Sequence, residues 1–343
     1  MILDVGHGSA AVLIDEKEAI VVDAGSGDLV TETLERFEIT EVRSLVISHR
    51  HHDHTSELPS LLSNPDLEIK QLFLNADPTR TPSTPFEEQL RAALNDSVRR
   101  SGTEFQQANV TLGARMSTAR LTVEVLSPSV DLQLSGVDGE TASGEVLHPH
   151  ALAVVLRVSV ENGRAVLLGA DLDYTRFQEL IDNDESDLSA DVLVYPHHGG
   201  LSGAGSESAE EAFAGRVASA VAPDVVVFSN GRDRFRNPRR EIVRGIRKAT
   251  DAKPMRMVCT QLSKECCAEE IPADGRLDDF LASAGGATGK SCCGSMIIDL
   301  GGHEHLLPIG HKHLDFVLNT VGDQALCLGK SLLQGEEAEG DVA

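Results

Sequence analysis

Four histidines and an aspartate follow a short apolar stretch near residue 50. Leu45–Ser48 is typical of a buried strand, and His49, His51, Asp53 and His54 come within the next six residues. Neutral imidazoles and carboxylates are the ligands of Zn²⁺ and similar ions. Two histidines spaced by two at a strand end can point at one ion, while Asp53 and His54 turn toward a second point. The pattern therefore predicts a metal site rather than a run of surface histidines.

Three further ligand candidates stand where other predicted strands meet loops. They are His150 before Ala151–Val158, Asp171 after Ala165–Leu168, and His197 or His198 after Val192–Tyr195. Side chains at strand ends are held rigid by the sheet, as a metal site requires. His148 is an alternative to His150, and the sequence alone does not choose between His197 and His198.

These motifs, in this order, resemble those of the metallo-β-lactamase superfamily. More narrowly, they resemble the soluble hydrolase domain of the ComEC competence proteins. The supporting segments, besides Ser48–His54, are Leu3–Gly8, Val21–Gly25, Val154–Arg157, Leu167–Asp171, Tyr195–Gly199 and Val227–Gly231 with Pro238 downstream. The resemblance covers residues 1–260 and part of 294–310. It implies an α/β fold, an αββα sandwich with the site at one edge, followed by a Cys-rich C-terminal extension.

The resemblance also implies a ligand set for two divalent ions, Zn²⁺ or Mn²⁺. One ion would be held by His49, His51 and His150, the other by Asp53, His54 and His197 or His198, with Asp171 bridging them. Asp23 would orient a ligand histidine from behind. The implied reaction is hydrolysis by a hydroxide that both ions activate, with Asp53 orienting it and taking part in proton transfer.

The sequence departs from the ComEC-like pattern in several places. His150 stands where those domains commonly carry Asn, and Arg236-Asn237-Pro238 replaces a frequent Gly-His-Pro. The long membrane regions of ComEC are absent, so DNA import is not implied. His7 lies in a Gly turn that resembles the family's Gln- or His-bearing loop, and a plain turn residue is the alternative interpretation.

The charge balance bears on the substrate. The chain has 30 Lys and Arg against 54 Asp and Glu, a formal net charge of −24, which repels phosphate backbones at long range. Against this background, the segment 232–240 concentrates five arginines: Arg232, Arg234, Arg236, Arg239 and Arg240. Arginine pairs bidentately with phosphate, and the cluster runs into a predicted helix start, which favours anions. We expect phosphate contacts from Arg232, Arg234, Arg236 and Arg239; an exposed face balanced by acids is the alternative.

All six cysteines follow residue 258, and four of them stand in adjacent pairs. Cys259, Cys266, Cys292 and Cys293 could form a closed four-thiolate zinc site, although their spacing is not that of a standard zinc knuckle. Buried or reactive thiols and disulfides are the alternatives. His303, His305, His311 and His313 follow and could add ligands. No export signal is visible, so we expect reduced thiols and a cytoplasmic location.

The periodicity of apolar residues and the positions of turn residues indicate the strands and helices that position these residues. Strands are expected at 2–5, 11–14, 19–22, 44–47, 71–74, 121–126, 151–158, 165–168, 192–195 and 225–229, and helices at 28–37, 86–100, 174–181, 206–218 and 239–250. We expect a catalytic domain over 1–253, strands that complete the fold with a Cys-rich insertion over 254–335, and an acidic disordered tail over 336–343. The stretch 127–147 is expected to be a loop. No apolar run approaches membrane-spanning length.

The sequence thus predicts a binuclear metal-dependent hydrolase, first a phosphodiesterase acting on DNA. A small-molecule hydrolase for a lactone, thioester or cyclic nucleotide is the main alternative. A metal-binding subunit of a larger assembly, for example one in phage defence, is a third hypothesis.

Overall fold

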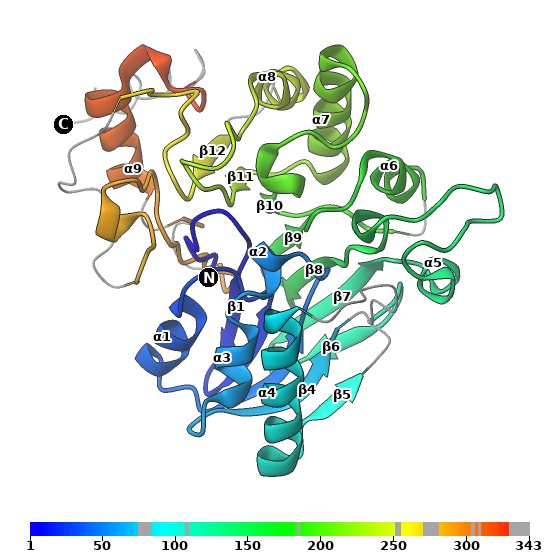
Figure 1. The fold of residues 1–343 in the computed structure, drawn as a ribbon. Helices are drawn as coiled ribbons and strands as arrows, with labels where there is room; N and C mark the ends of the chain where they lie inside the picture. The colour runs from blue at the N-terminus through cyan, green and yellow to red at the C-terminus, as the bar shows by residue number, and fades with distance from the viewer. Residues whose placement is uncertain are drawn as a thin grey trace.

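Two β-sheets pack face to face, and helices cover both outer faces (Figure 1). The computed structural model describes residues 1–74, 84–106, 110–183, 186–250, 255–269, 281–302, 306–307 and 310–328. Three buried clusters make up the layers: one between the sheets and one under the helices on either side. The expected αββα sandwich is confirmed.

The first sheet has the order β1-β2-β3-β4-β5. Its strands are β1 (Ala11–Asp15), β2 (Glu18–Val22), β3 (Glu41–Val46), β4 (Glu68–Phe73) and β5 (Glu104–Gln106). Only β1 and β2 pair antiparallel; the others run parallel. The helices α1 (Leu29–Arg36), α3 (Leu58–Ser63) and α4 (Pro85–Ser101) bury their apolar faces against its outer side. Thr84 and Glu87 form a capping box that fixes where α4 begins.

The second sheet has the order β12-β11-β10-β9-β8-β7-β6. Its strands are β6 (Arg115–Ser117), β7 (Leu121–Ser127), β8 (Val155–Val160), β9 (Ala165–Leu168), β10 (Val192–Val194), β11 (Val225–Phe228) and β12 (Arg256–Cys259). The strands β9 to β12 are parallel, so their carboxyl ends share one edge. The helices α6 (Tyr174–Asp182), α7 (Glu207–Val221) and α8 (Arg240–Ala249) cover the outer face.

Successive side chains of each buried strand point alternately toward the other sheet and toward the covering helices. In β11, Val225 and Val227 face the other sheet while Val226 and Phe228 face the helices. Successive side chains of a strand point to opposite faces, so a strand buried on both sides must be apolar throughout. With no Trp in the chain, the layer between the sheets is filled mainly by Val and Leu.

Several expectations from the sequence need correction. The expected strand at 2–5 is reduced to isolated bridges from Ile2 to Ala11 and Met296. The expected loop 127–147 contains a short helix, α5 (Val130–Ser135), which Ser129 caps. After residue 253 the described residues contain one strand, β12, which forms the edge of the second sheet. The expected tail 336–343 lies outside the described residues.

Short helical turns complete the fold. They are α2 (His52–Thr55), η1 (Pro149–Leu152), η2 (Pro196–Gly199), η3 (Gly286–Thr288), α9 (Gly310–Phe316), η4 (Val317–Val321) and η5 (Gly322–Gln324). Within the described residues, no helix has the length and apolar character needed to cross a bilayer.

Candidate metal centre

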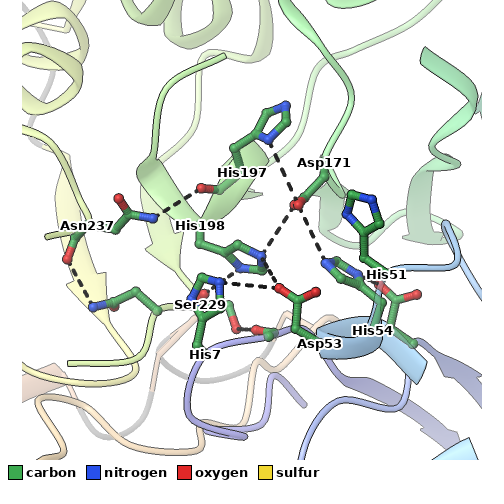
Figure 2. Close-up of polar contacts among 12 residues, drawn as sticks. His7, His51, Asp53, His54, Asp171, His197, His198, Ser229 and Asn237 are labelled. Carbon is green, nitrogen blue, oxygen red and sulfur yellow. Dashed lines mark hydrogen bonds and ion pairs between the residues drawn. The ribbon is translucent and has the colours of Figure 1, made fainter. Parts of the chain in front are cut away.

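Loops from both sheets bring seven histidines and two aspartates together at one edge of the sandwich. Figure 2 shows five of these histidines, His7, His51, His54, His197 and His198, around Asp53 and Asp171. Their side chains come from the turn after Ile2, the segment after β3, the turn η1, and the loops after β9 and β10. The one-turn helix α2 begins at His52 and carries Asp53 and His54, whereas His49 and His51 lie in the segment between β3 and α2. The ligand atoms form overlapping groups within 4.8 Å of one another.

The first group consists of His49, His51 and His150. The Nε2 atom of His150 lies 3.0 Å from Nδ1 of His51. Burial, and then the charge of His197, lower the pKa of His150 to about 4. Neutral imidazoles are the metal-binding form, so His150 can bind a cation without first losing a proton.

Asp171 occupies the centre of the site. Its Oδ2 atom lies 3.7 Å from Nε2 of His54, 3.8 Å from Nε2 of His49, 3.9 Å from Nδ1 of His197 and 4.0 Å from Nε2 of His150. Its Oδ1 atom lies 3.5 Å from Nε2 of His198. These separations exceed ordinary hydrogen bonds, and an ion about 2 Å from each ligand atom would join such pairs.

Asp53 faces the same centre from the opposite side. Its Oδ2 atom lies 3.6 Å from Nε2 of His198 and 3.3 Å from Nε2 of His7 (Figure 2). Burial opposes the charged form of Asp53, but the neighbouring imidazoles of His198 and His7 outweigh it and lower the pKa of the carboxyl group. Asp53 is therefore ionised at neutral pH.

Two ligand histidines are anchored through their second ring nitrogen. Nδ1 of His54 lies 2.7 Å from Oδ2 of Asp23, whose carboxylate also accepts from the backbone and hydroxyl of Ser48. Nδ1 of His198 donates to the carbonyl oxygen of Ser229 at 2.7 Å. Such contacts fix the tautomer and turn Nε2 of each ring into the site.

The inward atoms of the site have no protein partner. The Nε2 atoms of His49, His54 and His198 and Oδ1 of Asp171 are buried without a hydrogen bond within the described part of the chain. Each such atom costs about 1–3 kcal/mol if nothing pairs with it. Imidazole nitrogens and carboxylate oxygens that converge in this way are the donor set of Zn²⁺ or Mn²⁺, so the residues fit divalent ions.

In the protein without bound ions, the close packing of these histidines and aspartates shifts their pKa values. Burial, followed by the charge of His54, holds the pKa of His49 well below its ordinary value. Burial also opposes charge on His198, but Asp171 outweighs it and raises the pKa of His198 to about 9. Asp171 is itself kept ionised, because His198 and His54 overcome its burial. The cluster is thus a mixture of neutral and cationic imidazoles around two carboxylates.

The structure brings together all eight predicted ligands: His49, His51, Asp53, His54, His150, Asp171, His197 and His198. His148 is exposed and belongs to none of the groups. Of the two histidines left open after β10, His198 is the anchored one, beside Asp53 and Asp171. His197 contacts the other carboxylate oxygen of Asp171, Oδ2, and belongs to a group with His150.

His7 belongs to the site as well, a role that the sequence left as one of two alternatives. Its ring packs on His198, with centroids 4.7 Å apart. The glycines around it allow this approach. A Cβ atom on Gly8 would lie 2.3 Å from the carbonyl oxygen of Asp53, and one on Gly231 would lie 2.4 Å from the backbone nitrogen of His7. The Gly-His-Gly turn was the available sequence signal.

The arginine cluster divides into two kinds. Arg232 is only 6% exposed, and its guanidinium donates to the carbonyl oxygens of Leu262, Cys267 and Glu269. It therefore holds the following loop and is not a phosphate contact, which corrects the expectation. Arg236 and Arg240 pair with the carboxylate of Glu265, at 3.0 and 2.6 Å.

Arg234 and Arg239, in contrast, line the cleft above the metal ligands. This cleft has a volume of about 520 Å³, and Phe235, Leu201 and Asn237 also border it. Among the described residues neither arginine has a carboxylate within 4.0 Å, and Nε of Arg239 is buried without a hydrogen bond. Two cations thus remain available to an anionic substrate.

The cysteines gather apart from this centre. Cys259, Cys266, Cys292 and Cys327 line one small cavity beside η4, and Sγ of Cys292 lies 3.3 Å from Nε2 of His313. Burial raises the pKa of each of these four thiols. Cys293 instead points into the layer between the sheets. The expected set with Cys293 is therefore not brought together; Cys327 stands in its place, while His303 and His305 lie outside the described residues.

Comparisons with known proteins were made at the levels of sequence family and fold. A family model described as the metallo-beta-lactamase superfamily matches residues 3–229. No match was found among curated proteins. Similar solved structures include the metallo-beta-lactamase fold protein YhfI from Bacillus subtilis, with 12% identity, 76% of this chain and 96% of that chain covered, and a TM-score of 0.43. The short form of human tRNase Z is 16% identical, with 68% and 93% covered and a TM-score of 0.41.

Proposed function

Because the chain belongs to the metallo-β-lactamase superfamily, whose members are mainly metal-dependent hydrolases, we propose that it is a phosphodiesterase that cleaves nucleic acid, with DNA as the first candidate. The carrying observation is the pairing of a two-ion ligand set with two cleft arginines that have no acidic partner among the described residues. The ComEC-like resemblance agrees with this choice and remains part of the proposal.

The proposal assigns His49, His51 and His150 to one ion and Asp53, His54 and His198 to the other, with Asp171 between them. Zn²⁺ and Mn²⁺ both suit these ligands. Two such ions, when bound, polarise the phosphoryl oxygen and lower the pKa of water. An additional structural zinc at the cysteine cavity is a separate part of the proposal.

The chain's own residues supply orientation and proton handling. Asp53 is ionised and lies between His7 and His198, so its carboxylate can accept a hydrogen bond from the attacking water and receive a proton. Nε2 of His7 lies 3.3 Å from that carboxylate, so the two side chains can share the proton. Asp23 and Ser229 hold the ligand rings so that the geometry does not relax.

Arg234 and Arg239 would bind the phosphates that flank the scissile one. A guanidinium fork matches the geometry of phosphate oxygens. Two such forks in one cleft, neither with an acidic partner in the described part of the chain, offset the long-range repulsion of a chain with net charge −24. The same net charge favours the second candidate, a hydrolase for a small ester or cyclic nucleotide, because a small substrate meets less of the acidic surface.

A substrate panel tests the proposal. Protein loaded with Zn²⁺ or Mn²⁺ is assayed on single-stranded DNA, duplex DNA, RNA, a cyclic dinucleotide and a lactone, with Asp53→Ala as the inactive control. Cleavage of a polynucleotide by the wild type, absent in the control, supports the nuclease. Turnover of the lactone alone would favour the small-molecule hydrolase, and tight metal binding with no turnover of any substrate would favour a metal-binding subunit of a larger assembly.

A further inference from the structure

We infer that Phe235 forms a nucleobase-binding subsite at the rim of the metal cleft, so that the substrate is a nucleotide diester whose base stacks on this ring. The inference rests on the proposed phosphodiesterase function and specifies which part of the substrate is recognised beyond its phosphate. It depends on how Phe235 is exposed, what surrounds it and where it lies relative to the ligands.

Phe235 is an aromatic side chain turned toward water. It is 47% exposed, and among the described residues it is the one aromatic in the group of exposed large apolar side chains. The phenylalanines of the core, such as Phe177, Phe213 and Phe228, are fully buried. Phe235 gains little from the fold where it stands, since nearly half of its surface remains hydrated. A bound planar ring would cover that surface.

The position of Phe235 links it to the reaction centre through a single residue. Its ring centroid lies 4.6 Å from that of His7, and the His7 ring in turn lies 4.7 Å from that of His198. His7 also contacts Asp53, the proposed proton acceptor. A base resting on Phe235 therefore belongs to a nucleotide next to the scissile phosphate, not to a remote part of a long chain.

The surroundings combine apolar and cationic groups as a nucleotide requires. The guanidinium of Arg234 lies 5.7 Å from the centroid of the Phe235 ring, and Arg239 lines the same cleft. Leu201, 54% exposed, also borders the cleft. Aromatic rings that stack on bases, beside arginines that follow the phosphates, are the general means of binding single-stranded nucleic acid. An acyl chain would use Phe235 and Leu201 but would leave both arginines without a partner.

Two chromogenic diesters that release the same 4-nitrophenolate test the subsite. One is thymidine 5′-(4-nitrophenyl phosphate), and the other is methyl 4-nitrophenyl phosphate, which lacks a base. The variants are Phe235→Ala, Phe235→Leu, which keeps apolar bulk without a ring, and Phe235→Trp. Leu134→Ala, which removes an exposed apolar side chain outside the cleft lining, is the control.

We expect Phe235→Ala and Phe235→Leu to lower the ratio of kcat/KM for the thymidine diester over the methyl diester by about 5- to 100-fold, the range of one lost stacking contact. Phe235→Trp should keep the ratio, and Leu134→Ala should not move it. An unchanged ratio in Phe235→Leu would overturn the inference, since apolar bulk alone would then suffice.

A binding measurement separates this inference from the proposed function. Calorimetry compares thymidine 5′-monophosphate with deoxyribose 5-phosphate on metal-loaded wild type and Phe235→Leu. If the wild type cleaves neither diester, the phosphodiesterase proposal fails, yet a preference for the thymidine ligand that Phe235→Leu abolishes still supports the subsite. Equal affinity of the wild type for both ligands would refute it.

Discussion

Replacing Arg234 and Arg239 together with alanine should weaken the binding of single-stranded DNA and leave the metal centre intact. Both guanidiniums line the cleft without an acidic partner among the described residues. Each phosphate contact to a single strand contributes about 0.7 to the slope of log affinity against log salt, so losing two should make the slope shallower by about 1.4. Between 50 and 200 mM salt, those two contacts would account for a roughly sevenfold change in affinity.

At a fixed salt concentration, the loss of DNA affinity should exceed what the change in salt slope predicts, and most of the excess should come from Arg239. Nε of Arg239 is buried, and hydrogen bonds to charged groups contribute about 1.5–3 kcal/mol, whereas the exposed Arg234 contributes less because water screens it. We expect KM for DNA to rise by about ten- to a hundredfold, with kcat nearly unchanged. Fluorescence anisotropy over a salt series and steady-state cleavage measure the two effects.

The chain offers a matched control for this experiment. Arg236→Ala with Arg240→Ala removes the same charge from the same segment, but both side chains are occupied by Glu265. If long-range attraction were the whole effect, the two double variants would behave alike. Equal salt slopes in both, or normal cleavage by the cleft variant at physiological salt, would refute the assignment of phosphate contacts.

Four further outcomes are expected. Elemental analysis of gently purified protein should find about two transition-metal ions per chain, and less than one in active protein would contradict the ligand set. Asp53→Ala should abolish hydrolysis with little change in Tm, because the side chain faces the cleft and not the core; retained turnover would reject its role. Cys292→Ser should lower Tm and leave kcat of the folded fraction unchanged, and a zinc ion lost with it would locate a further metal at the thiols. In metal-free protein, the pKa of His198 is raised to about 9 from an ordinary 6.5, so its contribution to the free energy of unfolding is full below about pH 6.5 and is lost as pH rises through about 9; urea titrations of wild type and His198→Gln across that range should converge at high pH.

The convergence of the candidate ligands was predictable because strand ends determine where their side chains go. His49, Asp171 and His198 each follow a buried apolar strand, and a sheet gathers the carboxyl ends of its parallel strands at one edge. The resemblance to a family was still needed to predict that β3, which belongs to the other sheet, ends at the same edge of the sandwich. Periodicity alone indicates strands and says nothing of which sheet each one joins.

Side-chain direction explains most of what the sequence did not reveal. Cys292 and Cys293 are adjacent, and their side chains enter different layers of the sandwich, so they cannot serve one compact site. Arg232 and Arg234 are two residues apart in an irregular loop, where no period predicts burial, and only the first finds carbonyl acceptors. The composition therefore identified the cluster of arginines. It did not show which of them hold the loop in place and which face the cleft.

The segment after β12 helps to build the edge that carries the candidate metal centre, and this follows from the hydrogen bonds of one buried carboxylate. Asp4, in the turn that leads to His7, accepts hydrogen bonds from Gln261, Ser291 and the backbone of Gly285. Gln261 also accepts from the backbone nitrogen of Arg232, at the start of the loop that carries the cleft arginines. A buried carboxylate is retained only where such donors compensate its desolvation. The segment after β12 thus joins the His7 turn to the arginine loop. The side chains that we propose to bind the phosphate and the base of a substrate therefore stand on backbones that are fixed to one another.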